Sequence, residues 1–249
     1  MSDLNYIESL HSFIENYAEE RGLKNTLLAL PAARELLEGK IRKCSEFDRE
    51  GVLNQSYYEH CLQATKMLID IMIPLSHEDE DILIAGALLH DTIAHAGFKR
   101  GGRELVEDYH LDEHVYKIVR VTTTIDGKTD EDLKEYYDEI AKDRLAVLLA
   151  MADRGNLVEN LYALSINESL EYISEIRKYA LPMCVSALER YPDVLIPMRV
   201  LMSKVHSLID VTDIISHRYK DRKNTYEKEI LSLMEENSRL RGLIAQGTN

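Results

Sequence analysis

Glycine and proline are scarce in this sequence, with 11 Gly and 5 Pro among 249 residues. Few chain breakers allow long, uninterrupted helices, and the apolar/polar alternation typical of half-buried strands is rare. Cysteine is also scarce, since Cys44, Cys61 and Cys184 lie far apart and form no CxxC pair. Free, mostly buried thiols in a reducing compartment are the simplest interpretation of these three cysteines.

The sequence also lacks a visible export or membrane signal. The N-terminus has no basic region followed by an apolar run, and no apolar stretch reaches the length that a bilayer requires. The formal net charge of −14 leaves no general basic field, so a nucleic-acid backbone is not expected as the main partner. We therefore expect a cytoplasmic protein without membrane segments. The net charge leaves room for a small anionic substrate, because local lysines and arginines can still line a pocket.

Nearly every segment follows the helical period of 3.6 residues. The pattern predicts an all-α helical bundle in a single domain over residues 1–220. The expected helices cover about 2–22, 31–47, 56–73, 79–94, 103–109, 112–124, 138–162, 167–190 and 194–218.

The last stretch, 221–249, differs in kind from the rest of the chain. Apolar and core-type residues recur at alternating spacings of three and four: Lys223, Tyr226, Ile230, Leu233, Asn237, Leu240 and Ile244. This is a heptad seam of about three repeats with an asparagine at a core position, and it predicts a coiled coil and a homodimer. One amphipathic helix packed back on the domain is the alternative.

The dipeptide His90-Asp91 closes the apolar run 82–89, and polar side chains at the end of a buried helix are costly unless something binds them. His60 lies on an inward helix face upstream, and Asp153 lies on another downstream. Adjacent helical residues differ by about 100°, so His90 and Asp91 can share one ion only near a helix end or with a ligand from the flank. Two imidazoles and two carboxylates suit a divalent cation with positions open for water. A buried His-Asp pair that serves packing alone is the alternative.

Three blocks around these residues resemble the HD superfamily of metal-dependent phosphohydrolases, and most of all the hydrolase domain of RelA/SpoT-type enzymes. Ser56–His60 resembles the G-x-P-Y-x-x-H-P block, Ala87–Thr92 the A-L-L-H-D-x block, and Met151–Arg154 the L-A-D-R block. The resemblance covers about residues 50–165 and includes neither a synthetase nor a regulatory domain.

This resemblance implies an HD-domain helical bundle that removes the 3′-pyrophosphate of the alarmone (p)ppGpp or hydrolyses a related nucleotide. The implied cofactor is a divalent metal, Mn²⁺ first. The implied metal ligands are His60, His90, Asp91 and Asp153.

The chain departs from these relatives just after the His-Asp dipeptide. Ala94 and His95 occupy the places where the alarmone hydrolases carry Glu-Asp, the carboxylates assigned to water activation. An imidazole titrates near neutral pH, so His95 is the candidate for proton transfer or for orienting the metal ligands. The family's Arg-Lys pair that contacts guanine has no close equivalent, because Gly51 and Val52 stand there.

Several cations are candidates for phosphate contacts. Lys99, Arg100 and Arg103 lie in a glycine-rich loop after the expected helix 79–94. This loop either binds phosphate or is exposed to solvent without a ligand. Arg144 lies nine residues before Asp153 and either reaches a distal phosphate or pairs with a surface carboxylate. Arg154 either fixes the neighbouring Asp153 carboxylate or binds phosphate.

Two further sets of residues carry weaker signals. Tyr57 and Asn156 are candidates for a base or ribose pocket, although a tyrosine serves equally well in boundary packing. His110 and His114 have the i, i+4 spacing of one helix face, which suggests a second metal or a solvated surface.

Two functions from different classes follow from the sequence. The first is a metal-dependent phosphohydrolase that acts on a nucleotide or another phosphorylated small molecule. The second is an HD-fold nucleotide sensor or scaffold that keeps its metal and dimerises but has lost the water-activating carboxylate. The complete metal-ligand set favours the enzyme, and the Ala94-His95 replacement favours the sensor.

Overall fold

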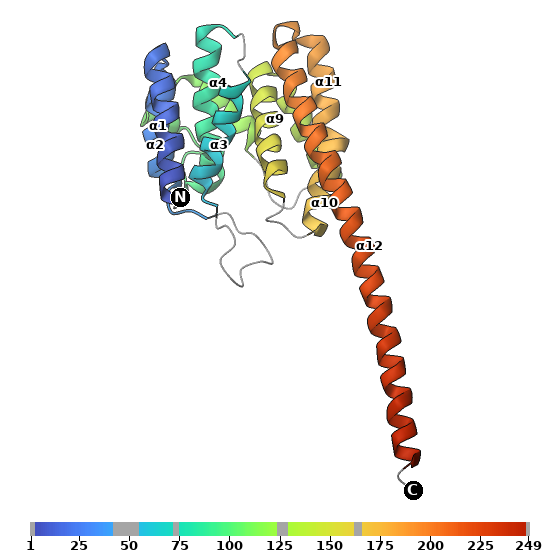
Figure 1. Cartoon of the computed structure of the whole chain (residues 1–249). Helices are drawn as coiled ribbons and strands as arrows, with labels where there is room; N and C mark the ends of the chain where they lie inside the picture. The colour runs from blue at the N-terminus through green and yellow to red at the C-terminus, as the bar shows by residue number, and fades with distance from the viewer. Residues whose placement is uncertain (1–2, 42–54, 72–74, 124–128, 162–165, 248–249) are drawn as a thin grey trace. The chain divides into compact units, whose positions relative to one another are not determined.

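The computed structural model describes residues 3–41, 55–71, 75–123, 129–161 and 166–247 (Figure 1). Within these ranges every regular secondary-structure element is a helix. The sole strand-like pairing there is an isolated bridge between Ile41 and Ser56. The predicted all-α bundle is therefore confirmed. The same ranges contain no helix with the length and apolar character that a membrane span requires.

The helices follow one another along the chain with few long connections. They are α1 (Asp3–Arg21), α2 (Lys24–Leu37), α3 (Tyr57–Asp70), α4 (His77–Leu89), α5 (Thr92–His95), α6 (Glu104–Glu107), α7 (Glu113–Thr122), α8 (Asp130–Ile140), α9 (Arg144–Glu159), α10 (Ile166–Glu175), the π-helix η2 (Ile176–Ala180), α11 (Leu181–Arg190), the 3-10 helix η3 (Pro192–Val194) and α12 (Leu195–Gly247). The chain divides into two compact units, Met1–His206 and Ser207–Asn249, so the division falls earlier than the expected boundary at residue 220.

Helix α4 forms the centre of the first unit and contacts α2, α3, α7 and α9; Figure 1 shows α4 beside α3. All residues from Ile82 to Leu89 are buried, as the unbroken apolar run predicts. Gly86 allows a close approach to α7, because a Cβ at this position would lie 2.4 Å from Cδ1 of Ile118. The apolar surroundings of α4 thus fix the place where His90 and Asp91 emerge.

Several expected helix boundaries are wrong: the expected helix 79–94 is two helices, α4 and α5, interrupted at His90-Asp91, and α2 ends at Leu37. A side-chain cap explains two further differences. The second helix begins at Lys24, with Pro31 inside it, because the carboxylate of Asp81 on α4 accepts bonds from the backbone N–H groups of Asn25 and Thr26. The expected helix 138–162 is two helices, α8 and α9, because Asp143 caps a new start by accepting bonds from the backbone N–H groups of Leu145 and Ala146, 2.8 and 3.3 Å away.

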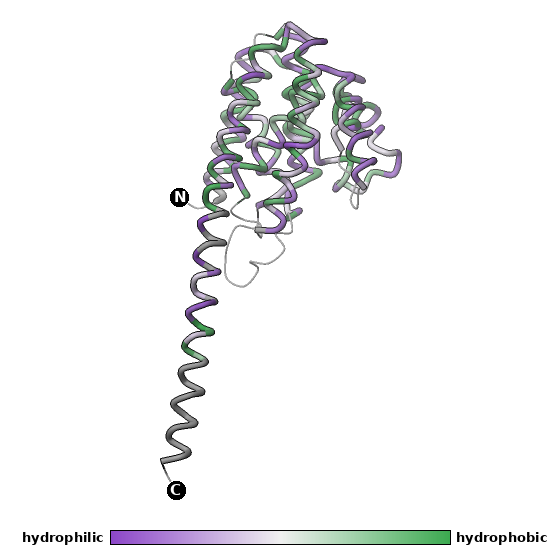
Figure 2. The backbone as a smooth tube through the Cα atoms, turned by 90° about the vertical axis from the view of Figure 1, so that its right-hand side faces the viewer, coloured by the Kyte–Doolittle hydropathy of each residue, from purple (hydrophilic) through white to green (hydrophobic). Residues whose placement is uncertain are grey.

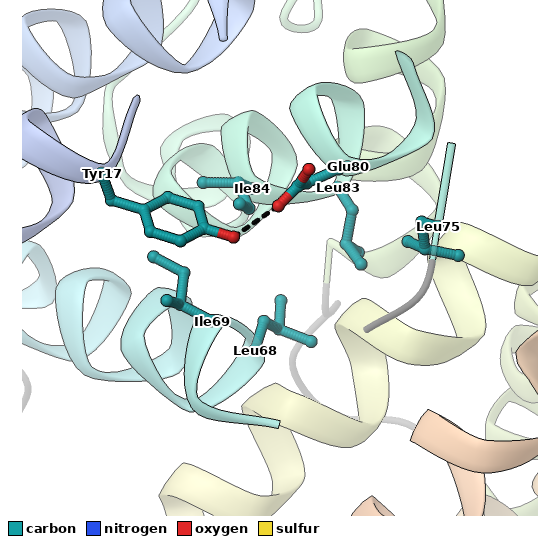
Figure 3. Close-up of a pocket in the computed structure, with 7 residues that line it drawn as sticks. All are labelled: Tyr17, Leu68, Ile69, Leu75, Glu80, Leu83 and Ile84. Carbon is teal, nitrogen blue, oxygen red and sulfur yellow. Dashed lines mark hydrogen bonds between the residues drawn. The ribbon is translucent and has the colours of Figure 1, made fainter. Parts of the chain in front are cut away.

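A partly buried polar pair joins α1 to α4. The hydroxyl of Tyr17 donates to Glu80 (Figure 3). The same carboxylate pairs with Arg21 at 2.6 Å. Burial and the Glu80 carboxylate raise the pKa of Tyr17 to about 12. The adjoining cavity measures about 10 Å³, which is room for one water and no ligand.

Cys61 and Cys184 are free and buried, as expected, whereas Cys44 lies outside the described residues.

The second unit is the continuation of α12, which runs unbroken past the expected end at residue 218. Its coloured part in Figure 2 includes both hydrophilic and hydrophobic stretches, and its large exposed apolar side chains include Val211, Ile214, Ile215, Tyr226, Ile230, Leu231, Leu233 and Met234. Three seam positions, Tyr226, Ile230 and Leu233, are thus exposed. The other four seam side chains, those of Lys223, Asn237, Leu240 and Ile244, lie outside the described set.

Candidate metal centre

The four predicted ligands come from two helices, α3 and α9, and from the bend between α4 and α5. His60 lies in the first turn of α3, whose start is capped by Ser56. His90 and Asp91 follow the last residue of α4 and precede α5, so the chain turns where the two side chains must face one point. Asp153 lies on α9, which packs against both α3 and α4.

These four side chains, hereafter the metal cluster, bring their ligand atoms together. The Nε2 atoms of His60 and His90 are 3.1 Å apart, and Oδ1 of Asp153 lies 3.0 and 3.6 Å from them, respectively. Oδ2 of Asp91 lies 3.8 Å from each Nε2. Ligands about 2.1 Å from one ion are separated by about 3.0–3.5 Å along the edges of an octahedron or a tetrahedron, so the spacing of His60, His90 and Asp153 fits a single cation. Asp91 lies slightly farther out and forms a second close group with His90 and Cys61.

The backbone fixes the tautomer of His90. Its Nδ1 lies 2.8 Å from the carbonyl oxygen of Ala87, which can only accept a hydrogen bond. Nδ1 therefore carries the proton, and in the neutral ring Nε2 presents a lone pair to the cluster.

A chain of side chains fixes the tautomer of His60 in the same way. The carboxylate of Glu59 accepts from Nε2 of Gln63, so Oε1 of Gln63 faces Asn156 and accepts from its Nδ2 at 3.0 Å. Oδ1 of Asn156 is then left to accept from Nδ1 of His60 at 2.6 Å. The neutral ring of His60 thus also presents an Nε2 lone pair to the cluster.

Four lone-pair atoms therefore converge in a buried place. The two histidines are 1% and 4% exposed, and Oδ2 of Asp91 is buried without a hydrogen-bond partner among the described residues. Such an arrangement is repulsive unless positive charge stands among the four atoms, either a metal ion or a proton on an imidazole; burial opposes that proton, but Cys61, Asp91 and Asp153 raise the pKa of His90. The donor set and the orphaned carboxylate oxygen fit a divalent metal.

Cys61 is the nearest alternative donor, with its sulfur 3.6 Å from Nδ1 of His90. Burial raises the pKa of this thiol, which keeps the sulfur protonated and a poor ligand. The donor set is thus two nitrogens and two oxygens, which suits Mn²⁺ and similar ions better than a thiolate site would.

Arg154 holds the second oxygen of Asp153. Its guanidinium donates to Oδ2 of Asp153 at 2.5 Å, to the hydroxyl of Tyr137 at 2.9 Å and to Glu175 at 3.2 Å. Burial opposes the ionisation of Asp153, but the Arg154 guanidinium holds the pKa of this carboxyl well below its usual value, and a proton on Nε2 of either histidine acts in the same direction. Arg154 was expected either to fix the Asp153 carboxylate or to bind phosphate. In the structure it contacts the Asp153 carboxylate.

The rings of Tyr57 and His95 stack on each other. Tyr57 is the first residue of α3, the helix that carries His60, and His95 is the last residue of α5. Their ring centroids are 3.8 Å apart with an angle of 26° between the planes. The carbonyl of His95 accepts from Nζ of Lys40 at 2.6 Å, which ties the short helix α5 to the end of α2. This stack fixes the plane of the imidazole one turn beyond Asp91.

The two arginines of the loop after α5 form ion pairs with carboxylates that lie close to them in the sequence. Arg100 pairs with Glu107 and Asp108, and Arg103 pairs with Glu113 at 2.6 Å. The backbone N–H of Lys99 donates to Glu104. The structure thus places both arginines in exposed local ion pairs instead of bringing them to the metal cluster.

Arg144 is not brought to the cluster either. It is the first residue of α9, nine residues or about 13 Å along the helix from Asp153. It pairs with Asp79 at 2.5 Å and with Asp193 at 3.0 Å. It therefore joins the start of α9 to α4 and to η3, the alternative role that its sequence position allowed.

The proposed second metal pair is not assembled. Helix α7 begins at Glu113, so His110 lies outside it, in a turn with φ of +59°, and does not share a helix face with His114. His114 instead contacts Asp143 at 2.6 Å. No metal-ligating group that contains either histidine occurs in the part of the chain that the structure describes.

The His114–Asp143 pair predicts a pH-dependent stability. The hydrogen bond to Asp143 raises the pKa of His114 above its ordinary value of 6.5, so this contribution is complete below about pH 6.5 and is lost as the pH rises through the raised pKa. Burial opposes ionisation of Asp143, but His114 and the backbone N–H groups of α9 lower its pKa, so the pair weakens again as the pH falls below 3.8.

We therefore expect His114→Ala to destabilise the protein more at pH 5.5 than at pH 8.5. The difference should stay below about 1 kcal/mol, because a third of each side chain is exposed. Urea unfolding at both pH values measures it, with the exposed His206→Ala as control. An equal loss of stability at the two pH values would contradict the pairing.

Three residues that support the cluster, Glu59, Gln63 and Glu175, were not identified from the sequence. Glu59 and Gln63 could have been, since they are four residues apart on the helix of His60 and form an i, i+4 pair. Glu175 carries no such signal in the sequence, because only the fold brings the end of α10 to Arg154.

Comparison with models of known protein families finds no match to this chain, and comparisons with curated proteins and with solved structures find none either.

Proposed function

We propose that this chain is a metal-dependent phosphohydrolase that acts on a nucleotide, with (p)ppGpp-like pyrophosphates as the first substrates to test. The convergence of four ligand atoms, in two fixed tautomers and with one unpaired carboxylate oxygen, supports this proposal most. The sequence resemblance to HD-superfamily hydrolases points to the same chemistry.

A bound Mn²⁺ would supply a Lewis acid for a phosphoryl oxygen and a nucleophilic water at neutral pH. The protein's own contribution is orientation. Ala87 and Asn156 hold the two imidazoles with Nε2 toward the cluster, and Arg154 leaves Oδ1 of Asp153 free to bind. In this proposal His95, fixed in plane by Tyr57, takes or gives the proton near the cluster.

The rival proposal is a nucleotide sensor or scaffold that binds metal without turnover. Its support is the replacement of the family's two carboxylates by Ala94 and His95, of which Ala94 has no proton to exchange. Release of phosphate or pyrophosphate separates the two proposals: the full chain is incubated with Mn²⁺ and a panel of nucleoside polyphosphates and monoesters, beside the metal-free protein, and both products are measured. Mn²⁺-dependent release from any nucleotide supports the enzyme. Tight Mn²⁺ binding with no release from the whole panel supports the sensor.

We also propose that the C-terminal part of α12 forms a two-stranded coiled coil with a second copy of this chain. Exposed Tyr226, Ile230 and Leu233 lie at seam spacing on an unbroken helix, and exposed apolar side chains in such a row favour burial against a partner.

A chain that ends at residue 220 is then expected to sediment as a monomer where the full chain sediments as a dimer. Leu233→Asp in the full chain should have the same effect, because a charge at a core position opposes pairing. A dimer that persists in both variants would show that the contact lies elsewhere.

A further inference from the structure

The heptad register of α12 continues in one phase from the first unit into the second. Tyr226 and Leu233 occupy position d of the seam, and steps of seven back along the helix reach two further d positions. These two, Met198 and Val205, are fully buried within the first unit, whereas the two seam residues are 61% and 59% exposed, respectively. The face of α12 that is covered at the start of the helix is therefore uncovered farther along, and an apolar row of this kind favours burial against a partner.

The residue types in the seam favour two parallel strands. Ile230 and Ile244 occupy position a, and Leu233 and Leu240 occupy position d. A β-branched residue at a with leucine at d favours a parallel pair of helices. Larger assemblies favour isoleucine at both positions, or leucine at a with isoleucine at d. The core residues of this seam thus follow the pattern of a pair.

Asn237, at position a, distinguishes the two orientations that a pair can take. In a parallel pair in register, the two copies of Asn237 occupy the same layer, where each carboxamide can donate to the other and accept from it. In an antiparallel pair, position a packs against position d of the partner, and the d positions of the seam carry tyrosine or leucine. A carboxamide buried against leucine lacks hydrogen-bond partners, which costs free energy. Asn237 therefore favours the parallel orientation and opposes a shift of register.

Charged residues beside the seam agree with the parallel orientation. In a parallel pair, position g of one helix lies next to position e of the partner, five residues later, and salt bridges between them set the orientation. This rule places Arg222 next to Glu227, and Glu236 next to Arg241. Between these two places it sets a glutamate beside a methionine, so like charges meet at none of the three.

From the core residues and these charges we propose that two copies of α12 form a parallel coiled coil, in register, over residues 223–247. The inference rests on the coiled coil proposed above and adds its orientation and register. Both chains then enter the coil at the same end. The pairing does not depend on whether the metal cluster hydrolyses a nucleotide.

A cysteine at the end of the seam tests the orientation. Gly247 is the next d position after Leu240, so Gly247→Cys in the full chain sets two thiols opposite each other in a parallel pair. In an antiparallel pair the two thiols lie at opposite ends of the seam, about 36 Å apart at 1.5 Å per residue. We expect mild oxidation to link most chains into dimers on a non-reducing gel. The matched control is Gly247→Ser, which keeps the native cysteines and should give no linked dimer.

A double-mutant cycle tests the charge pair across the seam. Glu236→Ala and Arg241→Ala should each raise the dissociation constant of the dimer about threefold, because each breaks the same pair on both sides of the coil. The double variant should be little weaker than either single variant. Within one helix these two residues are five apart and do not face each other, so non-additive losses report a contact between two chains. Sedimentation over a range of concentrations measures the three dissociation constants.

The failure of the orientation and the failure of the coiled coil give different results. A full chain that sediments as a monomer overturns the coiled coil itself. A dimer whose Gly247→Cys variant forms no disulfide, or whose losses from Glu236→Ala and Arg241→Ala simply add, keeps the coiled coil and overturns its parallel orientation. A disulfide-linked dimer together with non-additive losses supports the proposal.

Discussion

Replacing His90 by alanine is expected to lower Mn²⁺-dependent phosphate release from a nucleotide by at least about 1,000-fold. The imidazole supplies one of four converging ligand atoms, and its Nε2 is the atom that lies 3.1 Å from that of His60. A bound metal contributes several kcal/mol of transition-state stabilisation, and each 1.4 kcal/mol is a factor of ten in rate. Initial rates over a range of Mn²⁺ concentrations measure the loss.

The control is His206→Ala, which removes an exposed histidine of the same unit and should leave the rate unchanged. A His90→Ala protein that is folded by circular dichroism and keeps more than a tenth of the rate would exclude the cluster as the catalytic centre.

Replacing Arg154 by methionine is expected to lower the free energy of unfolding by about 3–5 kcal/mol, measured by urea denaturation in a chelator. The guanidinium is 4% exposed and pairs with the carboxylates of Asp153 and Glu175. Methionine fills most of the volume but leaves two carboxylates without their cation, and breaking a buried pair in this way has a cost of that size.

Arg100→Met is the matched control, because Arg100 pairs with three carboxylates on an exposed surface. Its expected effect is below about 1 kcal/mol. Equal losses in the two variants would mean that burial of the Arg154 network contributes nothing to stability.

The sequence was sufficient for the helical class and for the central helix, since the apolar run 82–89 has no polar face and must be buried. It also pointed to the proximity of His60, His90 and Asp153, because these inward positions lie on helices, or at a helix end, that pack together; their assignment to one metal ion with Asp91 stays a prediction. These predictions rest on local periodicity, which the fold preserves.

The predictions that differed from the structure depended on long-range contacts. Asp81 starts α2 ahead of Pro31 from a position more than fifty residues away, and no local pattern shows this. Arg144 was a candidate for the site, but the fold brings Asp79 and Asp193 to it. An arginine pairs with whichever carboxylates lie near it in the folded chain, and the spacing of residues in the sequence does not identify them.

The assignment of the four ligands to one ion is tested most directly by calorimetric titration of Mn²⁺ into the full chain and into its Asp91→Asn variant. The variant keeps the size of the side chain and removes the negative charge from the one cluster oxygen without a hydrogen-bond partner. We predict a saturable site in the wild-type chain and at least about 100-fold weaker binding in the variant, since even the partners of metal ligands contribute 10- to 100-fold. A wild-type chain with no saturable Mn²⁺ site, or a variant that binds Mn²⁺ equally well, would contradict the account.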